Sequence, residues 1–418
     1  MTVLHPMRWF AASVTGAILL VVGAPPASAQ AGFLDSLVRA NTRVVELRGD
    51  SLTGPGATFI LDETRRAQFV ALGEQHNARE IPIFTTALFR MLQARYGFHY
   101  FAGEQDPTSG RIVSEAPVRG SRDSVAALAR RYPHAFTFMS DQELQMLADI
   151  GASAKTAAHP VWGCDQAFGA THALDRLLPM VRGTGSRSAI VKLREMTAEK
   201  ERVRDLEAYH YMAMEPKGNT FADLAQLVRA APGSEAEQIV SDLVVSDRVY
   251  RNYREGNHYE NGYEREEYMK SRFLDEYRRA QRSGDALPRA VMKFGHWHIF
   301  RGIGPSNLQM LGNFVSEFAT SNGMRSFHIA IFPNGDPGGY GDISGWDPEI
   351  REFAAASSRD TWTIVDLRPL RANYARISKG LAPERADQLQ RWIFGFDAAL
   401  IMGRMQRATY ALNPGVKY

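Results

Sequence analysis

The sequence predicts a three-layer α/β fold, in which helices cover both faces of a mostly parallel central sheet and a helical cap is inserted. Short runs of β-branched and aromatic residues alternate with longer amphipathic patterns along much of the chain, which is the order that parallel sheets require. From about residue 190 to 282 the chain instead shows only charged amphipathic patterns. We interpret this stretch as the helical insertion.

Six runs have the composition of buried strands. In chain order they are Ala67–Leu72, Phe98–Ala102, Pro160–Gly163, Ala290–Gly295, Ser326–Phe332 and Trp362–Leu367. The clearest helix follows the first run, because apolar residues recur at spacings of three and four from Ile81 to Tyr96 and Gly97 ends the pattern. Asn77 and Glu80 precede it at the spacing of a capping box.

The first 29 residues have the layout of a secretory signal peptide. Arg8 precedes an apolar stretch, residues 11–22, and a triplet of the A-x-A type follows. The apolar stretch is too short to span a membrane comfortably. We expect cleavage near Ala29 and Gln30, which leaves residues 30–418 as one exported domain, periplasmic or secreted.

Composition restricts the classes of partner. Of 418 residues, 44% are hydrophobic, which is enough for a sizeable core. Lys and Arg number 49 against 46 Asp and Glu, so the charge gives no indication of a nucleic-acid partner. After the signal peptide no run approaches the roughly 18 apolar residues of a membrane span, and the single cysteine, Cys164, permits no intramolecular disulfide. The partner that we expect is a small-molecule substrate, and the oligomeric state is left open.

Acidic and imidazole side chains follow four of the predicted strands, at the point where each strand ends. In chain order they are Glu74 and His76, Glu104, Asp165, and His296 and His298. Because the carboxyl ends of parallel strands meet at one edge of a sheet, we expect these side chains to form one site.

Clustered carboxylates and imidazoles suit acid–base chemistry. Two nearby carboxylates repel each other when both are ionised, so one of Glu74 and Glu104 is expected to hold a proton near neutral pH. A water between Glu74 and His76 could be activated to attack a carbonyl carbon. His296 would then polarise the carbonyl or protonate the leaving group.

Three further residues are expected to support this chemistry. Asp165 and His298 lie at strand ends, and Arg265 could balance the acid pair if the insertion folds over it. The chain has no G-x-S-x-G, H-E-x-x-H, C-x-x-C or P-loop motif, which argues against the commonest competing chemistries. No cofactor is required for water attack of this kind.

A metal ion is an alternative. GHWHI places two imidazoles two residues apart, and on a regular strand such residues share one face, as metal ligands often do. The ligands would be His76, His296 and His298.

At these residues the chain resembles the erythromycin esterase-like proteins, in the superfamily that also includes the ChaN-like haem-binding proteins. LGEQHNAREIPIFTTALFRMLQARYGFHYFAGEQ is similar to the family's GE-x-x-H segment, the helix after it and a second strand that ends in glutamate. ELQMLADIGASAKTAAHPVWGCDQ is similar to its G-x-D strand, REEYM to its RD-x-x-M helix, FGHWHI to its AHNAH strand end and FGFDAALIM to its closing strand. The resemblance implies a three-layer α/β fold and a hydrolytic site that contains Glu74, His76, Glu104, Arg265 and His296.

Two spacings differ from the esterase form. One residue, Gln75, separates Glu74 from His76, as in the ChaN-like form, and the second histidine pair is also one residue closer. The resemblance therefore does not imply a macrolide substrate. We expect an exported hydrolase of an ester or lactone that acts without a serine nucleophile. The alternatives are a ChaN-like protein that binds haem or iron, a metal-dependent peptidase, and a scaffold without catalysis.

Overall fold

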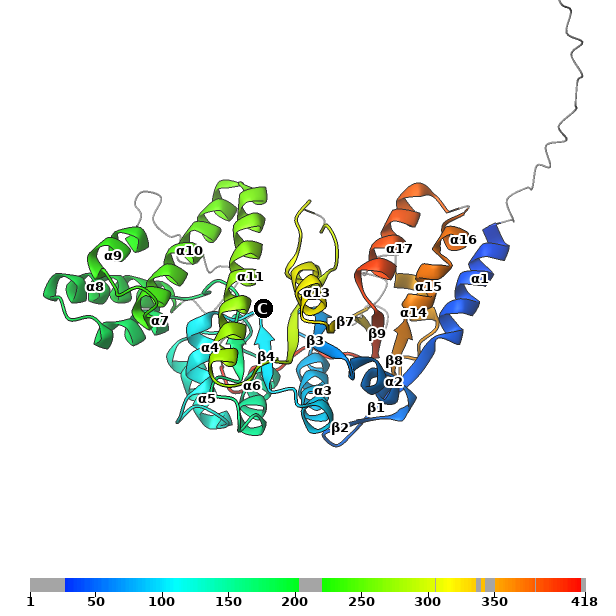
Figure 1. The fold of residues 1–418 in the computed structure, drawn as a ribbon, viewed down its shortest axis with the longest axis horizontal. Coiled ribbons are helices and arrows are strands. Elements are labelled where there is room, and N and C mark those ends of the chain that lie inside the picture. Colours follow the sequence, from blue (N-terminus) through cyan, green and yellow to red (C-terminus); the bar gives the residue numbers. More distant parts are fainter. Residues whose placement is uncertain are drawn as a thin grey trace, which may run out of the picture.

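The computed structural model describes residues 27–202, 220–304, 306–335, 340–342, 350–379 and 381–414. Within these ranges the chain forms a sheet with the strand order β2-β1-β8-β9-β7-β3-β6-β4-β5 (Figure 1). The strands are β1 (Thr42–Arg48), β2 (Ser51–Thr53), β3 (Ala67–Glu74), β4 (Tyr100–Gly103), β5 (Val161–Gly163), β6 (Ala290–Gly295), β7 (Arg325–Asn334), β8 (Trp362–Asp366) and β9 (Ala398–Gly403). Of the expected signal peptide, residues 1–26 lie outside the described ranges.

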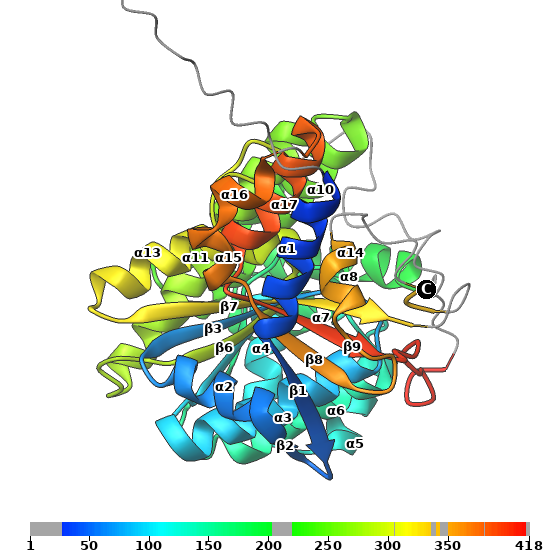
Figure 2. The same cartoon turned by 90° about the vertical axis from the view of Figure 1, so that its right-hand side faces the viewer.

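Helices cover both faces of the sheet. They are α1 (Ala27–Ala40), α2 (Gly54–Thr64), α3 (Glu80–Tyr96), α4 (Pro107–Ser114), α5 (Arg122–Arg131), α6 (Asp141–Ser153), α7 (Thr171–Leu177), α8 (Thr184–Lys200), α9 (Thr220–Val228), α10 (Glu235–Glu255), α11 (His258–Arg282), α12 (His296–Ile299), α13 (Leu311–Ser321), α14 (Arg351–Ala355), α15 (Arg368–Ala372), α16 (Tyr374–Ser378) and α17 (Pro383–Gly395). Figure 2 shows α2, α3, α5 and α6 below the sheet and α1, α13, α15 and α17 above it. No helix in the described part of the chain is long and apolar enough to cross a membrane.

The centre of the sheet is parallel. β9, β7, β3, β6, β4 and β5 run in one direction, whereas β8, β1 and β2 form an antiparallel edge. This confirms the predicted fold class. The six predicted strands match β3 to β8 to within two residues at each end, while β1 and β2 were not expected.

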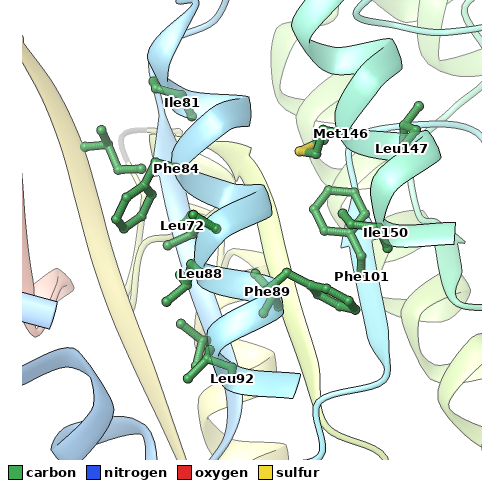
Figure 3. Close-up of a cluster of buried hydrophobic side chains, with 14 of the residues drawn as sticks. Leu72, Ile81, Phe84, Leu88, Phe89, Leu92, Phe101, Met146, Leu147 and Ile150 are labelled. Carbon is green, nitrogen blue, oxygen red and sulfur yellow. The ribbon is translucent and has the colours of Figure 1, made fainter. Parts of the chain in front are cut away.

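Side chains of β3 alternate between two cores. Val70 and Leu72 pack below the sheet against α3, and Phe69 and Ala71 pack above it, where Phe69 meets Phe273 of α11 edge to face at 5.1 Å. Figure 3 shows the lower core, with side chains from β3, α3, β4 and α6. Because both faces of β3 are buried, its sequence is a continuous apolar run rather than an alternating one.

The helix after β3 does not begin with the expected capping box. Asn77 has a φ of 65°, in the left-handed region, and α3 starts later, at Glu80. Glu80 instead accepts a hydrogen bond from the backbone N–H of Gln406 at 2.9 Å. The predicted end at Gly97 is correct, since this residue adopts a left-handed conformation with φ 69°.

Residues 404–414, which we call the C-terminal segment, cross the carboxyl edge of the sheet after β9. Ala408 N donates to Asn77 O at 2.9 Å, and Asp141 N donates to Thr409 O at 2.7 Å. The Asp141 carboxylate accepts hydrogen bonds from two further backbone N–H groups of the segment. The C-terminal segment therefore joins the loop after β3 to the start of α6.

The charged helical stretch lies at one end of the molecule. In Figure 1, α7, α8, α9 and α10 are at the left, and α11 returns toward the sheet. Helices α7 to α10 share an apolar core of their own. The described residues between 184 and 282 contain helices and no strand.

Candidate active site

The carboxyl ends of neighbouring strands bring two glutamates together. β3, β6 and β4 lie side by side in the sheet, and Glu74 at the end of β3 pairs in register with Gly295 at the end of β6. Glu104 follows β4, and its Oε2 accepts a hydrogen bond from Gly295 N at 2.9 Å. Both carboxylates therefore lie at one edge, next to the same glycine.

His76 lies between these two carboxylates. Its Nδ1 donates to Glu74 Oε1 at 3.2 Å, and its Nε2 lies 4.0 Å from Glu104 Oε2. The ring stacks on Phe138 with 4.6 Å between centroids, and the side chain is still 39% exposed. Burial would lower the pKa of His76, but the charges of Glu104 and Glu74 raise it above the ordinary value.

Arg265 of α11 holds Glu104 in place. Its guanidinium lies 2.7 Å from Glu104 Oε1 and makes two bonds to Asp165, at 2.6 and 3.0 Å. Burial alone would raise the pKa of Glu104. The charges of His76, His298 and Arg265 outweigh burial and lower this pKa to about 2. Glu104 is therefore a fixed, permanently charged carboxylate at neutral pH.

His298 lies near the other oxygen of Glu104. Its Nε2 lies 3.7 Å from Glu104 Oε1, and its Nδ1 forms a short hydrogen bond to Glu266 Oε1. The second oxygen of Glu266 accepts a bond from Leu311 N at 2.8 Å. His76 and His298 are thus arranged alike: a buried carboxylate binds Nδ1 of each ring, and each Nε2 faces one oxygen of Glu104.

Comparison with known proteins gives matches among solved structures. No family model and no curated protein matches the chain. A succinoglycan biosynthesis protein is similar over 92% of this chain and 100% of its own, with a TM-score of 0.57 and 14% identity. A protein from Bacillus cereus is similar over 91% and 99%, with a TM-score of 0.54 and 12% identity. The erythromycin esterase EreC, as a histidine-to-asparagine variant in its open conformation, is similar over 88% and 98%, with a TM-score of 0.53 and 14% identity.

The chain has the erythromycin esterase-like fold. At these identities the likeness establishes the architecture alone. Within that architecture, the chemistry has to be argued from the positions of this chain's own side chains.

The structure changes the expected placement of His296. The HWH residues form the helical turn α12 rather than a strand, so side chains two apart point in nearly opposite directions. His296 Nε2 donates to Ile331 O at 2.8 Å, and the ring stacks on Phe332 with 4.9 Å between centroids. Burial lowers the pKa of His296 to about 4. A neutral, buried ring whose Nε2–H is bound to the backbone is a poor acid or electrophile.

The expected metal ligands do not converge. In the described part of the chain, no three His, Cys, Asp or Glu side chains are grouped so that they could hold a metal ion. Instead, His76 donates to Glu74, His298 to Glu266 and His296 to the Ile331 carbonyl. The prediction that His296 and His298 share one face is therefore wrong.

The expectation that one of Glu74 and Glu104 holds a proton near neutral pH is also wrong. Each has its own cation: Lys293 Nζ lies 2.6 Å from Glu74 Oε1, and Arg265 binds Glu104. Burial would raise the pKa of Glu74, but the charge of Lys293 and the contact with His76 lower it. Both carboxylates are therefore ionised at neutral pH.

Three residues near the site were not identified from sequence. Lys293 is a single cation inside an apolar strand, AVMKFG. Glu266 directly follows Arg265, and Glu143 lies three residues after Ser140, which caps α6. A lysine inside a buried strand requires a buried anion. The sequence of β6 therefore indicated that a carboxylate must lie next to Lys293.

Proposed function

We propose that the protein is a hydrolase that cleaves an ester or lactone by direct attack of water. The observation that carries the proposal is the pair of imidazoles, His76 and His298, each of which faces a different oxygen of the ionised Glu104 carboxylate. The likeness in fold to an erythromycin esterase supports the reaction class.

His76 is proposed as the general base. Since Nδ1–H donates to Glu74, the lone pair of the neutral ring is on Nε2. The 4.0 Å between Nε2 and Glu104 Oε2 is too long for a direct hydrogen bond, and a water bound there would contact both groups. Nε2 would take a proton from this water as its oxygen attacks the carbonyl carbon.

His298 replaces His296 as the proposed acid. Glu266 fixes its ring through Nδ1, and its Nε2 lies 3.7 Å from Glu104 Oε1, whereas His76 lies near Oε2. A protonated His298 would donate to the departing alkoxide. Arg265 and Asp165 keep Glu104 in place between the two rings.

Water is the proposed nucleophile, because the nearby side-chain candidates are engaged. Cys164 is fully buried, and burial raises its thiol pKa well above the ordinary value. Ser109 is also buried, and its hydroxyl bonds to the Ala135 carbonyl and to His172.

The test is a panel of aryl esters, lactones and peptides, assayed with wild type, His76→Ala and His298→Ala. An exposed histidine on α11, His258, supplies the matched control His258→Ala. We expect ester or lactone hydrolysis that both site variants lose and the control retains. A Soret band on haem titration without hydrolysis would support the haem-binding alternative. Loss of activity to a chelator would support a metal-dependent enzyme.

A further inference from the structure

Glu74 contacts a buried ammonium group as well as His76. Lys293 Nζ lies 2.6 Å from Glu74 Oε1, the same oxygen that accepts from His76 Nδ1. The Lys293 side chain is only 3% exposed. Water can therefore do little to solvate its charge, and protein carboxylates must do so.

Lys293 is shared with a second carboxylate. Glu143 of α6 places Oε1 2.8 Å from Lys293 Nζ, and its side chain is 8% exposed. Burial raises the pKa of Glu143 to about 7, and the charge of Glu74 acts in the same direction, while Lys293 opposes it. Glu143 therefore changes charge near neutral pH, whereas Glu74 stays ionised.

We propose that Lys293 and Glu143 regulate the active site, because together they set the net charge that the imidazole of His76 faces. An ionised Glu143 competes with Glu74 for the ammonium group and favours the protonated imidazole. With Glu143 neutral, the positive charge of Lys293 acts on Glu74 and His76 alone and favours the neutral ring. This inference rests on the proposed function, in which the neutral ring takes the proton from water.

Other titratable groups also face this cluster from the elements around it. They are Glu104 after β4, His296 of α12, Tyr340, and Tyr410 of the C-terminal segment. The pKa of Glu104 is about 2, and that of His296 is about 4. Burial raises the pKa of both phenols. None of these four changes charge between about pH 6 and 8, whereas burial places the pKa of Glu143 inside this range.

The experiment follows the ring signals of His76 by NMR between pH 5 and 9, with His76→Ala to identify them. Glu143→Gln removes a negative charge, so the midpoint for His76 should fall by about one pH unit. Lys293→Met removes the positive charge, so the midpoint should rise, by less than this because Glu143 then stays neutral over more of the range. The double variant removes both charges and should return the midpoint toward wild type. The wild-type curve should be broader than that of Glu143→Gln, because two coupled groups titrate together.

Exposed positions supply the matched controls, Glu384→Gln on α17 and Lys192→Met on α8, which should leave the midpoint unchanged. An unchanged midpoint in Glu143→Gln overturns the proposal. If Lys293→Met does not fold, Glu143→Gln still tests the proposal, because glutamine has the same size as glutamate and should leave the fold intact.

The titration needs no substrate, so it separates this proposal from the function. Under the proposed function, the acid limb of kcat/KM should move with the His76 midpoint in every variant. A midpoint that moves in a protein that cleaves no ester contradicts the hydrolase and leaves the charge coupling standing. If the protein hydrolyses an ester but the His76 midpoint does not move in the variants, the proposed function stands and the charge coupling is contradicted.

Discussion

Nε2 of His298 lies 3.7 Å from one oxygen of Glu104, and Nε2 of His76 lies 4.0 Å from the other. Each ring is held through Nδ1 by a different buried carboxylate, Glu266 or Glu74. A carboxylate between two oriented imidazoles is suited to a reaction that removes a proton on one side and supplies one on the other.

We expect His298→Gln to reduce kcat/KM far more than His296→Gln. Loss of a general acid typically costs about two to four powers of ten. A glutamine at position 296 can still donate to the Ile331 carbonyl, so we expect less than about a tenfold loss, with a lower Tm from the altered packing. Steady-state kinetics and calorimetry on both variants test this ranking. Equal losses of kcat/KM in the two variants would indicate that His296 takes part in the reaction after all.

Glu104→Gln should reduce both turnover and stability. The variant weakens a charge-assisted bond to Arg265 while Asp165 still pairs with it, so we expect a cost of about 1–3 kcal/mol in the free energy of unfolding. Turnover should fall by two powers of ten or more. Denaturant unfolding against the exposed control Glu267→Gln measures the stability change. A rise in stability would indicate a repelling acid pair after all.

His328 should make the protein less stable in acid. Burial lowers its pKa in the folded protein to about 3, and its ring nitrogens bond to Ile299 O and Ser326 Oγ. The unfolded chain has an ordinary imidazole with a pKa of about 6.5. Between these values only the unfolded state binds the proton, so stability falls as pH falls through this window.

The corresponding variant is His328→Gln. Near pH 5 it should reduce the slope of the unfolding free energy against pH by about 1.4 kcal/mol per pH unit, the contribution of one proton. Urea unfolding from pH 7 to 4.5 measures the slope, with the exposed His258→Gln as control. An unaltered slope in the His328 variant would mean that another group takes up the proton.

Gly163→Ala should displace Asp165, which contacts Arg265 in the site. A Cβ at Gly163 would lie 2.0 Å from the Asp106 carbonyl oxygen, so the start of α4 would have to move. Asp165 follows two residues later and positions Arg265. We expect a loss of more than about 2 kcal/mol together with reduced turnover. Gly185→Ala on α8, with open space around it, should reduce neither property.

The mature protein should begin at or near Gln30. Cleavage there removes the apolar stretch and only the first residues of α1, while Leu34 and Val38 of that helix remain available to the upper core. N-terminal sequencing of protein recovered from the exported fraction tests this. Recovery of a chain that still contains Arg8 would exclude it.

Strands β3 to β8 were predictable because they are mostly buried on both faces and appear as apolar runs ended by polar residues, whereas β9 was expected only from the resemblance. β1 and β2 were not, because they form a half-exposed antiparallel edge whose pattern resembles a loop. Glu74, His76 and Glu104 could be placed from strand ends alone. The roles of His296 and His298 could not, since a helical turn instead of one more strand residue reverses which ring faces Glu104.

The ionisation of the two glutamates also depends on distant residues. Lys293 is 219 residues from Glu74 along the chain and Arg265 is 161 from Glu104. If those cations are not known, the two carboxylates are expected to repel each other, so that one of them holds a proton. With those cations, both acids ionise, and burial raises the pKa of their neighbour Glu143 to about 7 instead.

The C-terminal segment gives the molecule an order of assembly. His76 and Asn77 lie in the loop after β3, yet Asn77 bonds to Ala408, which follows it by 331 residues, so this loop is fixed only once the C-terminal segment is in place. A chain cut by a protease after Gly403 would keep every strand of the described sheet and lose the hydrogen bond that ties down the loop that carries His76, the proposed base. Cleavage of the C-terminal segment would therefore leave the sheet intact and abolish the proposed activity.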